Sequence, residues 1–252
     1  MRNEAASFLL AVQFLTRLPI SSSGLYSPER MAAAVRYYPL VGILVGGMSS
    51  ITFLCANIAL PQVIAVLLAI ATGLLITGAF HEDGLADTFD GIGGGHARDQ
   101  ALAIMKDSRL GTYGTTALVL VLGLKATALA ALPSELIVAG LIAGHGFSRL
   151  SSVLVIATSR YVRDEGTAKP VSGGISSFGL IVALLIAGAM ISAWCLFQQP
   201  AALAWAGGGL IVGHVAMRLF FERKLGGYTG DTLGAVQQVS EIGFYLGLVA
   251  WL

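Results

Sequence analysis

The segment QVIAVLLAIATGLLITGAFHEDGLADTFDGIGGG, residues 62–95, decides how this chain must fold. Residues 62–80 form an apolar run close to the roughly 20 residues that a helix needs to cross a bilayer. A cluster of carboxylates follows at once, made of Glu82, Asp83, Asp87 and Asp90. Ionisable groups are costly in a membrane and usually mark function there. The segment therefore predicts a spanning helix that ends at a functional surface.

The composition extends this interpretation to the whole chain. Of the 252 residues, 56% are hydrophobic and 12% are charged, whereas soluble domains are about 25% charged. Seven apolar runs are long enough to span, at residues 38–60, 62–80, 114–132, 134–157, 175–197, 201–221 and 235–252. We predict an all-α fold, a polytopic integral membrane bundle of about seven transmembrane helices, within a range of six to eight. It forms one domain over residues 1–252, and the shorter run at about 5–16 lies at the interface or re-enters.

Basic residues alternate sharply between the predicted loops. They occur before the first span and in the loops 81–113, 158–174 and 222–234, whereas the turns near Pro61, Pro133 and residues 198–200 have none. The positive-inside rule places every long, motif-bearing loop on the cytoplasmic face. The net charge of +1 gives no indication of a nucleic-acid partner. The lipid bilayer is the expected surrounding.

The carboxylate cluster has the spacing of a metal site on a helix. If the helix over 62–80 continues through residue 90, Asp83, Asp87 and Asp90 share one stripe, with Glu82 about a quarter-turn from Asp83. Like charges at this spacing repel, and a divalent cation would remove that conflict. Oxygen ligands without cysteine suit Mg²⁺, Mn²⁺ or Ca²⁺. The competing interpretation is a solvated helix end.

Groups suited to phosphate oxygens surround this cluster. Glycines in the segment 91–95 let backbone N–H groups approach an anion, or serve only as a hinge. Lys106 and Arg109 can share one helical face, and Asp107 either extends the metal site or orients Arg109. The candidate substrate-binding residues are Gly93, Gly94, Lys106, Ser108, Arg109, His145, Arg149 and Asp231. The residue types thus predict a site that binds a metal ion and a pyrophosphate. Such a site would carry out phosphoryl chemistry at a membrane surface.

Three segments carry a resemblance to a known family. They are HEDGLADTFDGIGGG (81–95), IMKDSRLGTYG (104–114) and LGGYTGDTLGA (225–235). In this order and spacing they resemble the signature segments of the adenosylcobinamide-GDP ribazoletransferases, also called cobalamin-5′-phosphate synthases. FLTRLPI (14–20) and YYPLVGILVG (37–46) are similar to that family's opening. The resemblance covers nearly the whole chain, with a loose match over 164–180, and Glu82 stands where many members have an apolar residue.

The resemblance implies a reaction. The adenosylcobinamide phosphate group would pass from adenosylcobinamide-GDP to α-ribazole or α-ribazole 5′-phosphate, with release of GMP. The 3′-hydroxyl of the acceptor's ribose would attack the phosphorus on the cobinamide side, which closes the nucleotide loop of cobalamin. The implied location is the bacterial cytoplasmic (inner) membrane. A second copy, or other cobalamin-assembly enzymes, would be compatible partners.

The resemblance also implies residue roles, with Mg²⁺ as the cofactor. Asp83, Asp87 and Asp90 would hold it, with Glu82 as a further candidate ligand. The expected catalytic residues are Asp83, Asp87, Asp90 and Asp107. Lys106 and Arg109 would bind the diphosphate, and Arg149 would contact a phosphate or the corrin amides. Asp107 and Asp231 are alternatives as the general base or as additional metal ligands.

Two other functions compete with this one. A CDP-alcohol phosphotransferase would perform similar chemistry on lipid acceptors, but DGLADTFDG (83–91) lacks the basic residue of that family's motif. A secondary transporter could use intramembrane Lys125, His145, Arg149 and Glu241 as a pathway. Transporters usually show repeats and place their sites near the membrane midplane. Here the acids gather in one surface loop.

Overall fold

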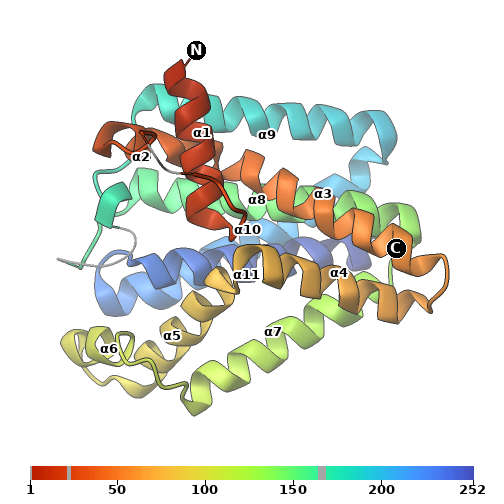
Figure 1. Ribbon diagram of the computed structural model, residues 1–252. Helices are drawn as coiled ribbons and strands as arrows, with labels where there is room; N and C mark the ends of the chain where they lie inside the picture. Colours follow the sequence, from red (N-terminus) through yellow and green to blue (C-terminus); the bar gives the residue numbers. More distant parts are fainter. Residues whose placement is uncertain (1, 22–23, 164–168) are drawn as a thin grey trace.

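The computed structural model describes residues 2–21, 24–163 and 169–252 (Figure 1). These residues are helical apart from loops and one isolated bridge between Tyr161 and Tyr228, so the predicted all-α class is confirmed. Residues 164–168 of the predicted 158–174 loop lie outside the described residues. The helices are α1 (Arg2–Leu15), α2 (Pro28–Ala34), η1 (Val35–Tyr37), α3 (Tyr38–Asn57), α4 (Gln62–Thr77), α5 (Phe80–Gly94), α6 (Arg98–Ile104), α7 (Thr112–Ala130), α8 (Ser134–Thr158), η2 (Lys169–Val171), α9 (Ser177–Phe197), α10 (Pro200–Leu225) and α11 (Gly230–Trp251).

Several helices have the length and composition of membrane spans. Within the described residues there are 5 of them, or up to 6 if the bent pair α4 and α5 forms one span. The 5 are Pro28–Asn57, Thr112–Ala130, Ser134–Thr158, Ser177–Phe197 and Pro200–Leu225. The chain is therefore a polytopic helical membrane protein, while the exact count of about seven spans stays a prediction. The N-terminal helix α1 packs against α2 and α3.

Helix α11 accounts for one predicted span, residues 235–252, that is absent from the span candidates in the structure. It has 22 residues but is interrupted by polar side chains, Gln237, Gln238 and Glu241. It contacts α5, α7, α8 and α10, and these three polar side chains are buried. A helix enclosed by other helices can carry polar groups that face the bundle interior. Helix α11 is thus the interior helix of the bundle.

The predicted continuous helix from residue 62 to residue 90 is wrong, because the chain breaks at Gly78. Gly78 and Ala79 both adopt left-handed backbone conformations, with φ of 66° and 54°. For the alanine this conformation costs about 1–2 kcal/mol. The axes of α4 and α5 therefore meet at 87°. The carboxylates follow the break, so α5 leads them away from the direction of α4.

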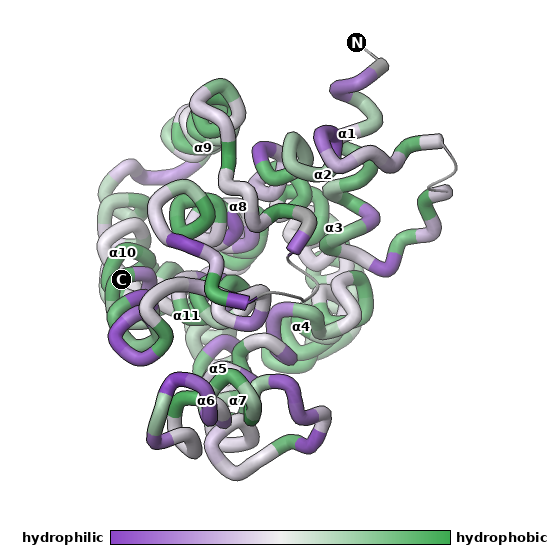
Figure 2. Tube along the Cα trace, turned by 90° about the vertical axis from the view of Figure 1, so that its left-hand side faces the viewer, coloured by the Kyte–Doolittle hydropathy of each residue, from purple (hydrophilic) through white to green (hydrophobic). Residues whose placement is uncertain are grey.

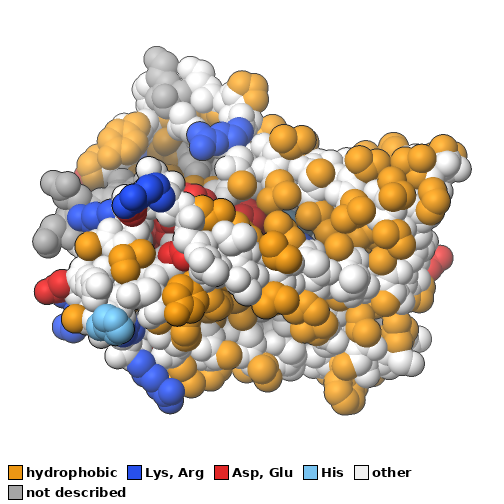
Figure 3. All heavy atoms as spheres, turned by 90° about the horizontal axis from the view of Figure 1, so that it is seen from below, with side chains coloured by type: hydrophobic (Ala, Val, Ile, Leu, Met, Phe, Trp, Pro, Cys, Tyr) orange, Lys and Arg blue, Asp and Glu red, His pale blue; other side chains and the backbone are white. Residues whose placement is uncertain are grey.

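The polar loops meet at one end of the bundle. Arg98 Nε donates to Leu225 O at 3.0 Å, and Lys224 Nζ donates to His96 O at 3.0 Å. Arg160 Nε donates to Gly226 O at 2.8 Å. Figure 2 looks at this end and shows hydrophilic stretches beside α6. In Figure 3, charged side chains gather toward one end, while apolar side chains cover much of the remaining face.

A close crossing of α5 and α11 joins the carboxylate helix to the bundle interior. A Cβ added to Gly84 would lie 2.6 Å from Asp231 O, and one added to Gly234 would lie 2.9 Å from His81 O. The backbones approach this closely only because both positions lack a side chain. The crossing brings the start of α11 beside the carboxylates of α5.

We expect the Gly84→Ala substitution to disturb this crossing. Its methyl group would meet the backbone of α11, which cannot give way as a flexible side chain can. The phosphoryl-transfer activity that the sequence predicts should fall about tenfold or more, because a misplacement near 1 Å can cost a large factor in rate. The measurement is product formation by purified protein in detergent.

Gly188→Ala on α9 is the matched control, since nothing lies within 4 Å of a Cβ there. Equal activities of the two variants would contradict the close-crossing argument.

Candidate active site

Three carboxylates gather at the crossing of α5 and α11. Asp83 is exposed, and Asp87 and Asp231 are partly buried. The charges of Asp231 and Asp83 both act on the Asp87 carboxyl group, and the Asp90 charge acts on it more weakly. Arg163 Nη1 lies 2.7 Å from Asp231 Oδ2 and supplies a positive charge at the edge of this cluster. We call Asp83, Asp87 and Asp231 the carboxylate triad.

Asp90 belongs to the predicted stripe but has a different partner. Its carboxylate accepts hydrogen bonds from Gly111 N at 2.8 Å and from Gly114 N at 2.9 Å. These N–H groups belong to the start of α7, where helical N–H groups lack partners within the helix and favour an acceptor. Asp90 therefore fastens the end of α5 to the start of α7.

Glu82 turns away from the triad into the bundle. It is buried, and its Oε1 accepts a hydrogen bond from Gln238 Nε2 at 2.8 Å. Gln238 Oε1 in turn accepts from Lys125 Nζ at 2.9 Å. Lys125 Nζ also lies 2.9 Å from Glu241 Oε1. Glu82 is thus the end of a buried polar network that joins α5, α7 and α11.

His145 and Arg149 lie in the same buried network. His145 Nδ1 is 3.3 Å from Glu241 Oε2, and Arg149 Nη1 donates to His145 O at 3.0 Å. Arg149 is 1% exposed and His145 is 9% exposed. Direct contact of these side chains with a large substrate is hard to reconcile with such burial. Their predicted substrate-binding role stays a prediction, and the contacts that the structure shows join Arg149 to His145 and His145 to Glu241.

The loop between α6 and α7 holds the other predicted groups at the surface. Lys106, Ser108 and Arg109 are exposed. Arg109 Nη2 lies 2.6 Å from Asp107 Oδ2, and the Arg109 hydrogen bonds lower the pKa of Asp107 to about 2. A carboxylate with so low a pKa is a weak base near neutral pH. The contacts found here join this loop to Asp90 through Gly111 rather than to the triad.

The predicted phosphate-binding glycines lie near the C-terminal end of α5. A Cβ at Gly93 would lie 2.7 Å from the ring of Tyr113, and one at Gly94 would lie 3.4 Å from Ile104 Cδ1. Both glycines are exposed. These contacts show packing of α5 against the following segment, and the binding of phosphate by these glycines stays a prediction.

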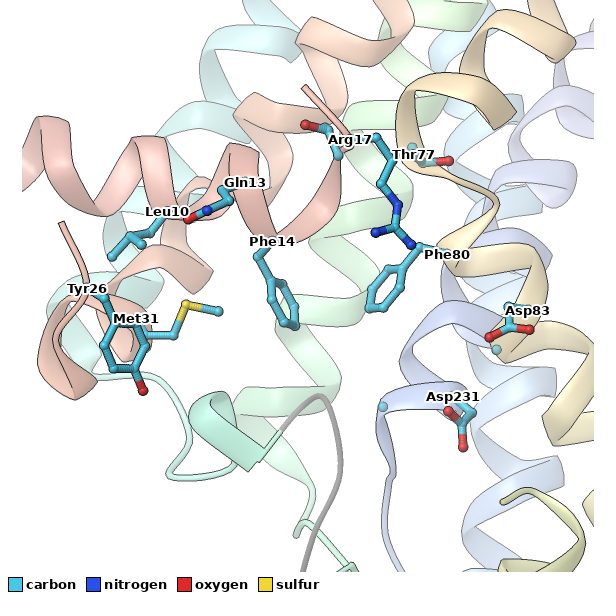
Figure 4. Close-up of a pocket in the computed structure, with 13 residues that line it drawn as sticks. Leu10, Gln13, Phe14, Arg17, Tyr26, Met31, Thr77, Phe80, Asp83 and Asp231 are labelled. Carbon is cyan, nitrogen blue, oxygen red and sulfur yellow. The ribbon is translucent and has the colours of Figure 1, made fainter. Parts of the chain in front are cut away.

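Two members of the triad, Asp83 and Asp231, line a cavity of about 610 Å³ (Figure 4). Asp83 and Asp231 lie toward one end of it, and Arg17 lies beside Phe80. Phe14 and Phe80 form its middle, and the wall on the other side is apolar and aromatic. The remaining lining residues are Leu10, Gln13, Thr16, Tyr26, Met31, Thr77, Gly84 and Gly230.

Sequence reasoning missed two cations of this site. Arg17, before the first predicted span, and Arg163, in the predicted loop 158–174, counted only among the basic residues that orient the chain in the membrane. Arg163 pairs with Asp231, and Arg17 lines the cavity. Arg17 stands within the opening segment FLTRLPI, which carries part of the family resemblance. That resemblance pointed to the segment but did not assign a function to Arg17.

The fit of a metal ion depends on the chemistry of these donors. Among the described residues, no group of three His, Cys, Asp or Glu side chains is already arranged as a metal site. The triad nevertheless supplies only carboxylate oxygens, which is the donor set that hard cations such as Mg²⁺ prefer. The mutual repulsion of the three carboxylates would be relieved by a cation between them. Donor chemistry therefore fits a divalent cation.

Comparison with known proteins identifies the family. Residues 7–249 match the model of the cobalamin-5-phosphate synthase family. The chain is 45% identical to an adenosylcobinamide-GDP ribazoletransferase of Leptothrix cholodnii, over 98% of this chain and 96% of that protein. It is 42% identical to the protein of the same name from Shewanella frigidimarina, over 96% and 94%, and 39% identical to that from Shewanella woodyi, over 100% and 98%. No solved structure matches the chain.

We expect the Lys125→Met variant to be strongly destabilised. It leaves the fully buried Glu241 without its nearest cation, and breaking a buried pair in this way costs about 3–5 kcal/mol of the free energy of unfolding. The double variant Lys125→Met, Glu241→Met should recover much of this loss, because no uncompensated charge remains. The measurement is an unfolding titration in mixed micelles.

Arg223→Met, at the exposed end of α10, is the control and should change stability by less than about 0.5 kcal/mol. A single variant as stable as the parent would show that the pair does not support the bundle.

Proposed function

The chain belongs to the cobalamin-5-phosphate synthase family, and from this premise we propose how its residues carry out the family's reaction. The protein is a transferase that closes the nucleotide loop of cobalamin. The comparisons do not favour a CDP-alcohol phosphotransferase or a transporter. The proposal concerns the metal, the residue roles and the orientation in the membrane.

The main support for the proposal is that Asp83 and Asp231 come from distant parts of the chain and line one cavity. Asp87 stands close enough for both charges to act on it. We assign Asp83, Asp87 and Asp231 as the residues that would hold Mg²⁺. This ligand set replaces Glu82 and Asp90 by Asp231, because Asp231 lines the cavity beside Asp83, whereas Glu82 and Asp90 do not line it and bind groups of α11 and α7.

The reaction requires charge neutralisation and placement more than covalent chemistry by the protein. An oxygen–phosphorus bond forms between the acceptor's ribose hydroxyl and the phosphate on the cobinamide side. The bond from that phosphorus to the oxygen of GMP breaks, and GMP leaves with the bridging oxygen. A bound Mg²⁺ would supply neutralisation of the charge that develops on the phosphoryl oxygens.

The protein's own side chains hold the reactants and the proton. Arg163 keeps Asp231 in place through their 2.7 Å ion pair. Carboxylate oxygens of Asp83 and Asp231 lie in the cavity wall, where they can accept the proton of the attacking hydroxyl directly or through one water. Lys106 and Arg109, exposed on the loop after α6, are available to the diphosphate of the donor.

The orientation follows from the distribution of charge. Arg98 at the start of α6, Arg160 after α8 and Lys224 at the end of α10 donate hydrogen bonds to neighbouring segments at a single end of the bundle. The positive-inside rule assigns such an end to the cytoplasm. We therefore propose that the site faces the cytoplasm from the bacterial inner membrane, where its soluble, phosphate-bearing substrates are accessible.

The test combines the protein in detergent with adenosylcobinamide-GDP and α-ribazole, with and without Mg²⁺. We expect GMP and a cobalamin product only when the metal is present. Asp87→Asn should lower the rate by more than about 100-fold, because it removes one carboxylate charge from the proposed metal site.

Asp99→Asn is the matched control, since its side chain is 90% exposed and pairs only with Arg98 among the described residues. Full activity after removal of divalent cations would contradict the metal, and full activity of Asp87→Asn would contradict the triad.

A further inference from the structure

We propose that the cavity beside α1 is the acceptor subsite, in which Arg17 binds the 5′-phosphate of a nucleotide whose flat base lies against Phe14 and Phe80. This inference rests on the proposed function, because it assigns one of the two substrates to a particular part of the same site. The family name, cobalamin-5-phosphate synthase, refers to a phosphorylated product, whereas the name adenosylcobinamide-GDP ribazoletransferase does not specify whether the acceptor is phosphorylated. Such a subsite would favour the phosphorylated form of the acceptor over α-ribazole.

The size of the cavity favours the acceptor over the donor. Its volume is about 610 Å³, within the range of about 300–1,000 Å³ found for sites of small organic ligands. A nucleoside phosphate belongs to that size class. Adenosylcobinamide-GDP carries a corrin ring and two nucleosides and is much larger, so only a part of it could enter.

The aromatic wall suits a flat heteroaromatic base. The rings of Phe14 and Phe80 meet edge to face, with centroids 5.6 Å apart and an interplanar angle of 73°. Tyr26, which is 60% exposed, lines the same cavity beyond Phe14. Aromatic side chains bind bases through stacking, without a requirement for a particular hydrogen-bond pattern. The wall therefore provides affinity for the base of the acceptor.

Arg17 is held at the break between α4 and α5. Its backbone N–H donates to Ile76 O at 2.6 Å, and its side chain crosses Gly78, where an added Cβ would lie near the Arg17 side chain. Gly78 also has the left-handed φ of 66°, so the break that redirects α5 is the same feature that makes room for Arg17. The guanidinium points along the cavity wall toward Phe80 in Figure 4.

The charge of Arg17 is available to a ligand. Among the described residues, no carboxylate lies within 4.0 Å of a nitrogen of its guanidinium, whereas Arg163 at the same site already has Asp231. The Arg17 residue is exposed. A guanidinium presents a planar set of donors that matches phosphate oxygens. Arg17 is therefore the cation of this cavity that can bind a phosphate.

The arrangement of the lining orders the acceptor along the cavity. Arg17 lies beside Phe80, between the end that holds Asp83 and Asp231 and the apolar wall around Leu10, Tyr26 and Met31 (Figure 4). In a nucleotide the ribose stands between the base and the 5′-phosphate. With the phosphate on Arg17 and the base on Phe14, a ribose hydroxyl would be free to face Asp83 and Asp231, where the phosphoryl group must arrive.

The test compares α-ribazole with α-ribazole 5′-phosphate as acceptors for the parent and for Arg17→Gln. We expect the KM for the phosphorylated acceptor to rise about 10- to 100-fold in the variant, the loss of a charged hydrogen bond. The KM values for α-ribazole and for adenosylcobinamide-GDP should stay within about twofold of those of the parent, since the proposal gives Arg17 no contact with either substrate. Phe14→Leu should raise the KM for both acceptors alike.

Arg223→Gln, an exposed cation at the end of α10, is the matched control and should leave all three KM values unchanged. Calorimetric binding of each acceptor to the parent and to Arg17→Gln is measured beside the kinetics, with size-exclusion elution as the check on folding. If Arg17→Gln binds the phosphorylated acceptor more weakly than the parent but binds α-ribazole equally well, the subsite is supported even without turnover. Absence of turnover in the parent counts against the proposed function and not against the subsite.

Other outcomes overturn the subsite. A rise in the KM for adenosylcobinamide-GDP in Arg17→Gln would assign Arg17 to the donor diphosphate. Equal effects on both acceptors, or no effect, would show that Arg17 does not bind the 5′-phosphate. A third outcome would assign Arg17 to a lipid headgroup. In that case phosphatidylglycerol in mixed micelles competes with the phosphorylated acceptor in the parent but not in Arg17→Gln. The two proteins then have the same acceptor KM when phosphatidylglycerol is absent.

Discussion

The contact between the backbones of α5 and α11 at Gly84 is the constraint on which the rest of the site depends. It brings Asp231 next to Asp83 and Asp87, because no side chain separates the two helices at that point. The 87° turn at Gly78 and Ala79 makes the contact reachable, since a straight continuation of α4 would carry the carboxylates elsewhere. Two local backbone features thus create a site from distant parts of the chain.

The buried polar network holds this crossing in an apolar surrounding. Lys125 neutralises Glu241, and Gln238 connects Lys125 to Glu82 on the carboxylate helix. Polar groups away from water cost free energy unless they are paired, so each member of the network restricts where the others can stand. The first turn of α5 is therefore tied to α7 and α11 through Glu82, immediately before the exposed Asp83.

Chemically identical carboxylates acquire different roles through their neighbours. Asp83 lies in the cavity wall, whereas Asp90 accepts two backbone N–H groups from the start of α7. The spacing of Asp83, Asp87 and Asp90 predicted a common stripe, with Glu82 about a quarter-turn away, and this holds best for Asp83 and Asp87. The roles of Glu82 and Asp90 could not be predicted, because their partners come from helices whose position beside α5 is not encoded in that segment.

The sequence by itself determined the all-helical membrane class, most of the helix boundaries, the family and the segment that holds Asp83 and Asp87. These depend on local properties, namely the length of apolar runs, the placement of charges and the residue sequence of short motifs. Only the tertiary structure decided that the helix breaks at Gly78, that α11 is an interior helix, and that Arg17 and Asp231 share a cavity. Those features arise from contacts between residues far apart in the chain, whose free energies depend on which surfaces meet.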